Sequence, residues 1–389
     1  MTSVPTNDIH ARADLLVAAY ARTGYARVSP AILQPAEPFL DLSGEDMRRH
    51  MYLVADAAGR EFCLRPDLTI PVARDYLASA AAAQPAGFCY LGPVFRDRGA
   101  AVAGEFLQAG IESFGRADKA AADAEALALG IAATAHYGVA APRILTGDVA
   151  LFAALIAALD IAPAWKRRLL KDFNRKSMLA QNLERLTLAT RKGRSEYQGV
   201  LAALANANPK AAQALVTDLL SIAGKSAVGG RSIGEIADRF VEQAELGASS
   251  ALPSEARDLI ARFLAVAGAP REAAAALRAL AAEAGISLDP ALRQFESRTG
   301  FMAARGVEVD GIRFATAFGR GVDYYSGFVF ELYDPAGRID GQLVAGGRYD
   351  ALLMRLGSPQ PVAAVGFAAW IERLASLAAK GGETSGETA

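Results

Sequence analysis

The chain has 389 residues, of which 52% are hydrophobic and 21% charged, a composition typical of a globular protein with two or three domains. Its net charge of −1 provides no general attraction to nucleic acid, which weighs against tRNA binding. No apolar run approaches 18 uncharged residues and the N-terminus has no apolar signal core, so we expect no membrane span and no secretion signal. The two cysteines, Cys63 and Cys89, lack zinc-ligand spacing; we expect a reducing cytoplasmic location and no metal.

The first 162 residues alternate between helical and strand patterns. In chain order, these patterns predict a helix over 6–23, a strand over 24–33, a hairpin over 51–70, a helix around 71–82, strands over 88–95 and 105–115, a helix over 118–137, a strand over 142–148 and a helix from 149.

The pattern becomes continuously helical from about 163 to 300 and then returns to strands. Alternation predicts strands over 312–319, 328–334 and 337–347, followed by a closing helix over 368–380. We therefore expect an α+β core formed by residues 1–162 and 300–380, a helical insertion over 163–299 and a flexible tail over 381–389. Because the strands follow one another in hairpin order, the sheet is expected to be antiparallel and flanked by helices.

Polar residues follow or interrupt several of these apolar strands. LRPDLT, residues 64–69, places an arginine, an aspartate and a threonine at a strand end, and a surface ion pair between Arg65 and Asp67 is one interpretation. Arg96 ends the strand GPVFR, where its planar fork could bind a carboxylate or phosphate, or face solvent.

Gln108 and Glu112 lie four residues apart on one predicted strand and therefore share a face. If that face is buried, the amide and the carboxylate need polar partners, which a ligand would supply; the alternative is a solvated face. The segment GRGVDYYSGFVFE begins with Arg320 after its glycine, and its paired Tyr324 and Tyr325 point to opposite faces, so one can reach a pocket.

Together, six segments in this order resemble the class II aminoacyl-tRNA synthetase core, and specifically histidyl-tRNA synthetases. GYARVSPAIL resembles motif 1, LGPVFR with EFLQAGIESFG resembles motif 2, and VAAVGFAAWIERL resembles motif 3. LRPDLT, GRGVDYYSGFVFE and AGGRYDALL resemble the segments that select histidine. The resemblance covers about residues 5–160 and 300–377.

The resemblance implies roles for particular side chains of a histidine site. Asp67 and Thr69, assisted by Gln108, would hold the α-amino group, although the family usually has glutamate at position 67. The imidazole contacts would fall on Glu112 and Tyr325 with Tyr324 nearby, Arg96 and Arg320 would face the α-carboxylate and α-phosphate, Pro30 would lie at a dimer interface, and Arg373 would be the motif 3 arginine.

Three departures from the synthetase pattern favour a different function. Only 16 residues follow Arg373, where the synthetases carry an anticodon-binding domain. The motif 2 loop, DRGAAVAGE, is short and lacks later basic residues, and Trp370 replaces a small residue that would lie against adenine. We therefore expect the amino-acid half of the site to be kept and the nucleotide half, with Trp370 and Arg373, to be degraded.

This pattern resembles the regulatory subunits of ATP phosphoribosyltransferase. The resemblance implies a non-catalytic subunit of this glycosyltransferase complex in histidine biosynthesis, which activates a short-form catalytic subunit and binds L-histidine for feedback inhibition. It also implies homodimers within a hetero-octamer, with no cofactor, tRNA or membrane partner. Two alternatives stay open: a minimal histidine-activating enzyme, and an amino-acid sensor for another partner.

Overall fold

The computed structural model describes residues 6–42, 48–82, 84–99, 102–173, 214, 218, 252–320 and 324–383. The chain forms two compact units, one from Met1–Phe152 with Leu264–Ala389 and the other from Ala153–Phe263. The boundaries of the second unit differ from those of the predicted insertion over 163–299, because helices near the end of that range pack against the helix Lys119–His136 of the first unit. Residues 384–389 of the predicted tail lie outside the described residues, whereas 381–383 continue the last helix.

Helices and strands of the first unit follow the order predicted from the sequence, with a few differences in type. Its helices are α1 (Thr6–Arg22), α2 (Glu37–Leu42), α4 (Thr69–Ala78), α5 (Lys119–His136), α13 (Pro270–Glu283), α14 (Asp289–Ala304), η1 (Val309–Gly311), α15 (Leu352–Arg355) and α16 (Ile371–Glu383). Helix α6 (Val149–Ala158) crosses the division between the units, and α7 (Pro163–Phe173) and α12 (Ser254–Leu264) follow in the second.

The strands described by the structure form two sheets. A nine-stranded sheet has the order β1 (Ala26–Val28), β5 (Ala86–Phe95), β6 (Glu105–Phe114), β12 (Ala364–Trp370), β11 (Val344–Arg348), β10 (Phe328–Tyr333), β7 (Arg143–Asp148), β9 (Arg313–Ala315) and β8 (Ala267–Gly268). A three-stranded sheet has the order β2 (Leu33–Pro35), β4 (Glu61–Leu64) and β3 (Leu53–Ala55).

The α+β class is confirmed, and the large sheet is mixed. Its central strands from β5 to β7 pair antiparallel, as expected from their hairpin order. Near its edges β1 pairs parallel with β5 and β7 pairs parallel with β9, which the order of strands along the chain did not indicate.

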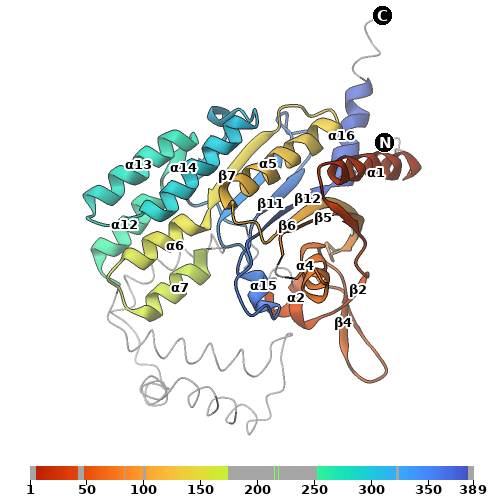
Figure 1. Cartoon of the computed structure of the whole chain (residues 1–389), viewed down its shortest axis with the longest axis horizontal. Coiled ribbons are helices and arrows are strands. Elements are labelled where there is room, and N and C mark those ends of the chain that lie inside the picture. The colour runs from red at the N-terminus through yellow and green to blue at the C-terminus, as the bar shows by residue number, and fades with distance from the viewer. Residues whose placement is uncertain are drawn as a thin grey trace, which may run out of the picture. The chain divides into compact units, whose positions relative to one another are not determined.

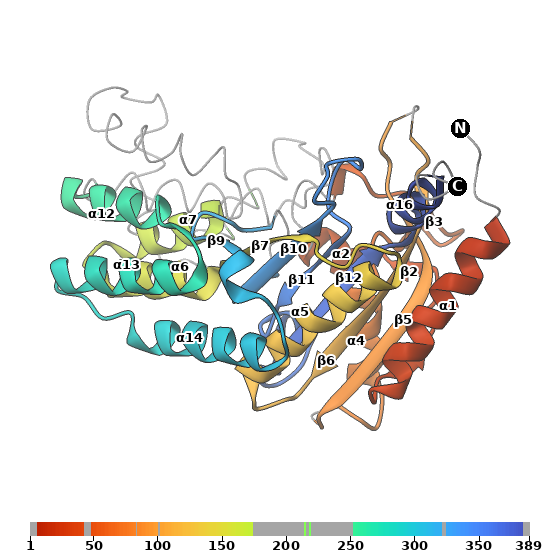
Figure 2. The same cartoon turned by 90° about the horizontal axis from the view of Figure 1, so that it is seen from above.

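Each face of the large sheet carries its own hydrophobic core. On one face α1, α5 and α16 pack against the central strands, and Leu16, Leu127 and Leu374 contribute one buried residue from each helix. The opposite face is covered by α2, α4 and α15 together with residues of the small sheet. Figure 1 shows these two layers, and Figure 2 shows α5 lying along the strands. The second core surrounds the polar residues discussed below.

One predicted helix is partly wrong. Residues 368–370 belong to β12 rather than to the closing helix, which begins at Ile371. The run AAWIERL has helical spacing of apolar residues, but Ala368 and Trp370 pair with Gly110 and Gln108 of β6. Tertiary pairing therefore overrides the local propensity of two alanines. Among the described helices, none is both long and apolar enough to cross a membrane.

We predict opposite effects for two glycine-to-alanine substitutions. A Cβ at Gly366 would overlap the Glu112 carboxylate and the Ile111 carbonyl, whereas a Cβ at Gly300 in α14 would meet nothing within 4 Å. Gly366→Ala should therefore lower the melting temperature by about 3–10 °C through overpacking. Gly300→Ala should raise it slightly, since alanine favours a helix by about 1 kcal/mol. Equal melting temperatures for both variants would contradict this packing.

Candidate ligand-binding site

Neighbouring strands of the large sheet form the floor of a small pocket. On the β6–β12 ladder, Gln108 lies directly opposite Trp370 and Glu112 lies directly opposite Gly366. Between these two residue pairs the ladder carries small residues, and one of them, Ala368, also pairs with Ala345 of β11. Because side chains opposite one another project to the same face, the small residues leave a hollow bordered by larger ones.

Glu112 is wholly buried and is held by hydroxyl groups from three elements. Thr69 at the start of α4 donates to its Oε1 at 2.7 Å, and Tyr90 on β5 donates to the same oxygen at 3.2 Å. The hydroxyl of Tyr349 donates to Oε2. The carboxyl group also lies against Gly366, where any side chain would collide with it. These contacts fix the carboxyl beneath the pocket.

Burial raises the pKa of Glu112 to about 8, because the apolar surroundings disfavour the charged form. The hydrogen bonds from Tyr349 and Thr69 act in the opposite direction, and nearby Asp67 raises the pKa further. Glu112 is therefore mostly protonated at neutral pH in this arrangement. In that state it can donate one hydrogen bond as well as accept others.

Two acceptors without charged partners line the pocket. Gln108 is 1% exposed, and its Oε1 atom has no hydrogen-bond partner among the described residues. Asp67 is also buried; it accepts the Ile70 N–H at 3.2 Å and makes no ion pair within the part of the chain that the structure describes. Burial raises the pKa of Asp67, although the nearby Arg96 acts against this. The two groups suit a cationic hydrogen-bond donor.

An arginine without an acidic contact lies beside these acceptors. Arg96 donates through Nε to the Pro66 carbonyl at 2.7 Å and lies over the Phe106 ring, 5.5 Å from its centroid. In the described ranges no carboxylate is within ion-pair distance of it. Burial lowers the pKa of Arg96 to about 10, so it remains charged at neutral pH. Such a guanidinium can receive a carboxylate or a phosphate.

The opposite wall is formed by residues that precede and belong to β10. Arg320 donates to the Tyr325 hydroxyl at 2.6 Å and pairs with Glu331 of β10 at 3.2 Å. The rings of Tyr324 and Tyr325 lie 4.9 Å apart. Both tyrosines are buried and both line the pocket, so the expectation that they point to opposite faces is wrong. They precede β10 in an irregular segment, where strand alternation does not apply.

The cavity enclosed by these walls has a volume of about 60 Å³. The residues lining the cavity are Asp67, Thr69, Arg96, Gln108, Arg320, Tyr324, Tyr325, Ala345, Tyr349, Gly366, Phe367, Ala368 and Trp370.

The structure brings most of the sequence-predicted site residues to this one pocket. Glu112 lies just beneath the pocket and accepts hydrogen bonds from two residues that line it, Thr69 and Tyr349. It does not bring Arg373 there: this side chain donates to the Gln342 carbonyl at 2.5 Å and lies over Trp370. Pro30 is buried, and its carbonyl accepts a hydrogen bond from Arg65.

The burial of these residues excludes two interpretations of the sequence that assigned them no role in a site. Arg65 and Asp67 are 3% and 7% exposed, so they do not form a surface ion pair. The face that carries Gln108 and Glu112 is buried rather than solvated. Sequence reasoning missed three partners. Tyr90 and Tyr349 lie far from Glu112 along the chain, and Glu331 ends the segment of Arg320, where no local pattern distinguishes it as a partner. AGGRYDALL was noted for its resemblance, without a role for Tyr349, which donates to Glu112.

Comparisons with known proteins agree with the fold. A family model described as histidyl-tRNA synthetase matches residues 6–228 and 213–374. An ATP phosphoribosyltransferase regulatory subunit from Brucella canis is 41% identical over 350 residues, which cover 89% of this chain and 92% of the relative.

Solved structures are similar over nearly the whole chain. One is titled an ATP phosphoribosyltransferase regulatory subunit/histidyl-tRNA synthetase from Bacillus halodurans; it has a TM-score of 0.66 and 21% identity and covers 97% of this chain and 81% of its own. Another is a histidine–tRNA ligase subunit from Alicyclobacillus acidocaldarius, with a TM-score of 0.59, 25% identity and coverage of 98% and 96%.

We predict a pH-dependent effect of Glu112→Gln on stability. Since the folded-state pKa of Glu112 lies near 8, above the ordinary 4.5, the folded state is favoured below the ordinary value and loses stability as pH rises toward 8. The loss should be on the order of 3 kcal/mol. The melting temperature of the unmodified chain should therefore fall more between pH 5 and 8 than that of Glu112→Gln.

Glu125 on α5 provides a matched control. Its pKa is lowered by hydrogen bonds from Tyr25 and Arg116, which outweigh the opposing effect of burial. Glu125→Gln should therefore remove stability that is already fully present at pH 5, leaving the slope between pH 5 and 8 unchanged. If Glu112→Gln also left the slope unchanged, the raised pKa of Glu112 would be wrong.

Proposed function

We propose that this chain, which belongs to the family of ATP phosphoribosyltransferase regulatory subunits, binds free L-histidine and performs no chemical step itself. In this proposal it activates a separate short-form catalytic subunit in the cytoplasm, and histidine in the pocket favours a less active state of the complex. The 41% identity to named regulatory subunits over nearly their full length supports the partner. Homodimers within a hetero-octamer, with Pro30 near the dimer interface, are part of the same proposal.

The observation that carries the histidine proposal is the Oε1 of Gln108, which has no partner in the described part of the chain and lies beside Asp67, with Arg96 close by. A buried acceptor without a partner is costly, and an ammonium group would satisfy both acceptors at once. Arg96 would then receive the carboxylate of the same ligand. Acceptors and a guanidinium lining one small pocket therefore suit the zwitterionic end of an amino acid.

The other end of the pocket supports an imidazole. Tyr325 contributes a phenol, and Glu112 with its hydroxyl partners lies beneath the floor. An imidazole has two nitrogens, and in the neutral form one donates and the other accepts. A carboxyl group with a pKa near 8 and a phenol can match either tautomer. A site of such buried polar groups should strongly reject ligands that lack these nitrogens.

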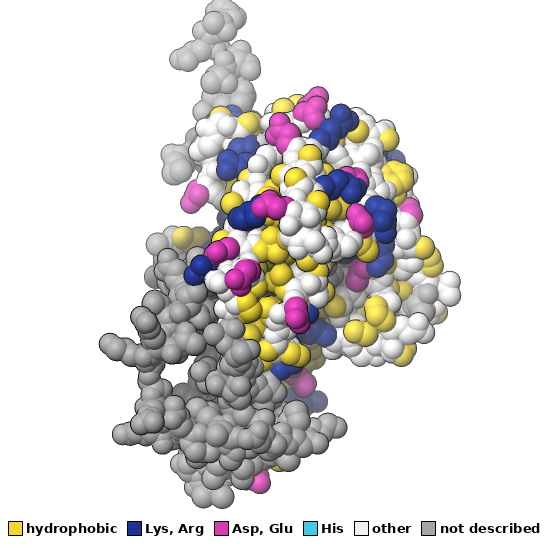
Figure 3. Space-filling view, turned by 90° about the vertical axis from the view of Figure 1, so that its left-hand side faces the viewer, with side chains coloured by type: hydrophobic (Ala, Val, Ile, Leu, Met, Phe, Trp, Pro, Cys, Tyr) yellow, Lys and Arg dark blue, Asp and Glu magenta, His cyan; other side chains and the backbone are white. Residues whose placement is uncertain are grey.

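Two features support a role without nucleotide chemistry. Trp370 is 4% exposed and contributes its indole to the pocket wall, where it takes space next to the amino-acid site. Arg373 is bound to the Gln342 carbonyl. On the face drawn in Figure 3, the described acidic and basic side chains are interspersed rather than gathered into a basic surface, which gives little support to tRNA binding.

We predict that Asp67→Asn weakens histidine binding. The substitution removes a buried negative charge next to the ligand's ammonium group, and the affinity measured by calorimetry should fall about 30-fold, corresponding to ~2 kcal/mol. Asp56→Asn, in an exposed turn closed by Arg60, is the control and should bind like the unmodified chain. Unchanged affinity in Asp67→Asn would remove Asp67 from the site.

A second prediction distinguishes a regulator from a histidine-activating enzyme. The presence of Arg96, Arg320 and Arg373 favours the enzymatic alternative. The purified chain should bind histidine but give no histidine-dependent ATP–pyrophosphate exchange. Mixed with a short-form catalytic subunit, it should raise phosphoribosyl transfer, and histidine should reverse this increase. Asp67→Asn should shift the inhibition to higher histidine concentrations. Robust exchange by the chain alone would instead establish the enzymatic alternative.

A further inference from the structure

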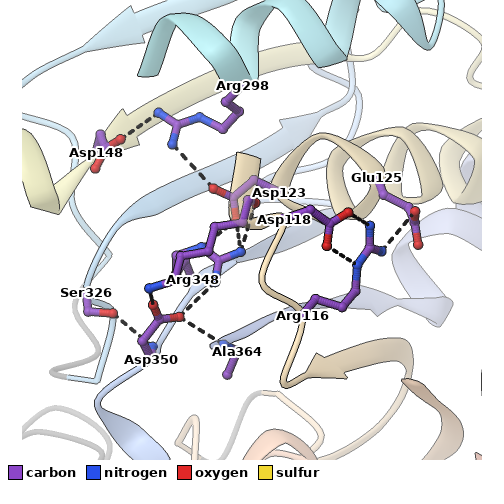
Figure 4. Close-up of polar contacts among 11 residues, drawn as sticks. Arg116, Asp118, Asp123, Glu125, Asp148, Arg298, Ser326, Arg348, Asp350 and Ala364 are labelled. Atoms are coloured by element: carbon purple, nitrogen blue, oxygen red, sulfur yellow. Dashed lines mark hydrogen bonds and ion pairs between the residues drawn. The ribbon is translucent and has the colours of Figure 1, made fainter. Parts of the chain in front are cut away.

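A chain of buried ion pairs lies behind the tyrosine wall of the pocket. Arg348 at the end of β11 pairs with Asp123 of α5 at 2.7 Å, and Asp123 also faces Arg298 of α14 at 3.4 Å. Arg298 in turn pairs with Asp148 at the end of β7 at 2.6 Å. All four residues are at most 6% exposed. Figure 4 shows that they converge from different helices and strands.

Arg348 has more partners than Asp123 alone. Its Nη1 donates to Asp350 at 2.8 Å and its Nη2 donates to the Lys119 carbonyl at 3.0 Å. Asp350 also accepts the N–H of Ala364 at 2.9 Å, which ties it to the beginning of β12. The guanidinium therefore bridges α5 and the segment after β11, a task that requires donors pointing in several fixed directions.

The backbone around Arg348 is joined to the segment that carries the paired tyrosines. The Ser326 N–H donates to the Arg348 carbonyl at 2.8 Å, and the Asp350 N–H donates to the Ser326 hydroxyl at 2.9 Å. Gly327 lies against the aliphatic part of the Arg348 side chain, since a Cβ there would be 3.3 Å from its Cδ. Figure 4 shows Ser326, Asp350 and Arg348 together.

The residues next to these contacts are the ones that face the pocket. Tyr324 and Tyr325 precede Ser326, and Tyr349 stands between Arg348 and Asp350. Tyr349 donates to Glu112 and makes an edge contact with Tyr324, with ring centroids 5.7 Å apart. Any shift of Arg348 would therefore be passed directly to three aromatic side chains of the wall.

Buried ion pairs contribute little net stability compared with apolar residues of similar size, because desolvation offsets the attraction. Their consequence here is geometric. We propose that Arg348 is a positioning residue of the pocket: by bridging Asp123 and Asp350 it fixes the Ser326 segment and aims Tyr324, Tyr325 and Tyr349 at the ligand. The identity of that ligand, histidine, rests on the function proposed above.

Arg348→Lys in the full chain tests this proposal. Lysine keeps the positive charge but has one ammonium group, which cannot hold both carboxylates and the Lys119 carbonyl in the same geometry. Histidine affinity by calorimetry should fall about tenfold. Leu277→Ala, a fully buried residue of α13 that does not line the pocket, is the control for general destabilisation. It should lower the melting temperature at least as much while changing histidine affinity less than about twofold.

A double-mutant cycle shows whether Arg348 acts through a tyrosine. If it does, Arg348→Lys should reduce affinity clearly less in a Tyr349→Phe background, in which the contact to Glu112 is already lost. Independent effects that simply add would overturn the positioning role, as would unchanged affinity in Arg348→Lys alone.

The positioning role of Arg348 can be tested even if the histidine proposal fails. If the unmodified chain did not bind histidine, amide hydrogen exchange would decide the positioning role without a ligand. Exchange in peptides covering 324–330 and 349–352 should be faster in Arg348→Lys than in Leu277→Ala at equal loss of melting temperature. Equal exchange in these peptides would overturn the role of Arg348.

Discussion

The buried side chain of Glu112 is the constraint on which the arrangement of the pocket depends. It stands on β6 near the centre of the large sheet and has no exposed surface. A buried carboxyl needs hydrogen-bond partners, and these come from Thr69 on α4, Tyr90 on β5 and Tyr349 after β11. The space it occupies comes from the absent side chain of Gly366 on β12. One carboxyl group therefore determines how four elements distant in sequence must approach one another.

The two sides of the small cavity are held differently. The Arg320–Tyr325 side is held by the Arg320–Glu331 pair and, through Ser326, by backbone and hydroxyl contacts to Arg348 and Asp350. A ligand that fits only one of two arrangements shifts the population toward that arrangement. Transmission to a partner subunit requires this kind of difference in affinity between two states. A pocket whose walls adopt two such arrangements would suit the sensor that we propose.

Much of the fold could be predicted from the sequence because its signals are local. Hydrophobic alternation located the long strands, and the spacing of Gln108 and Glu112 placed both on one face, which the structure shows to be buried. The parallel edge pairs could not be predicted, since they join segments far apart along the chain. Tyr90 was missed for the same reason: nothing in FCYLGPVF distinguishes a tyrosine that packs from one that donates to Glu112. The Arg348–Asp123 pair, which spans 225 residues, likewise has no local signature.

Trp370 and Gln108 face one another across the β6–β12 ladder, so the two halves of the predicted site share a border. The indole shields the Gln108 amide from water, and an acceptor in such surroundings interacts more strongly with a charged donor. A smaller residue at position 370 would open space for a nucleotide, but it would also let water compete with the ligand's ammonium group. In the proposed site, the same side chain would therefore close the nucleotide half and strengthen the amino-acid half, and the two effects would have one physical origin.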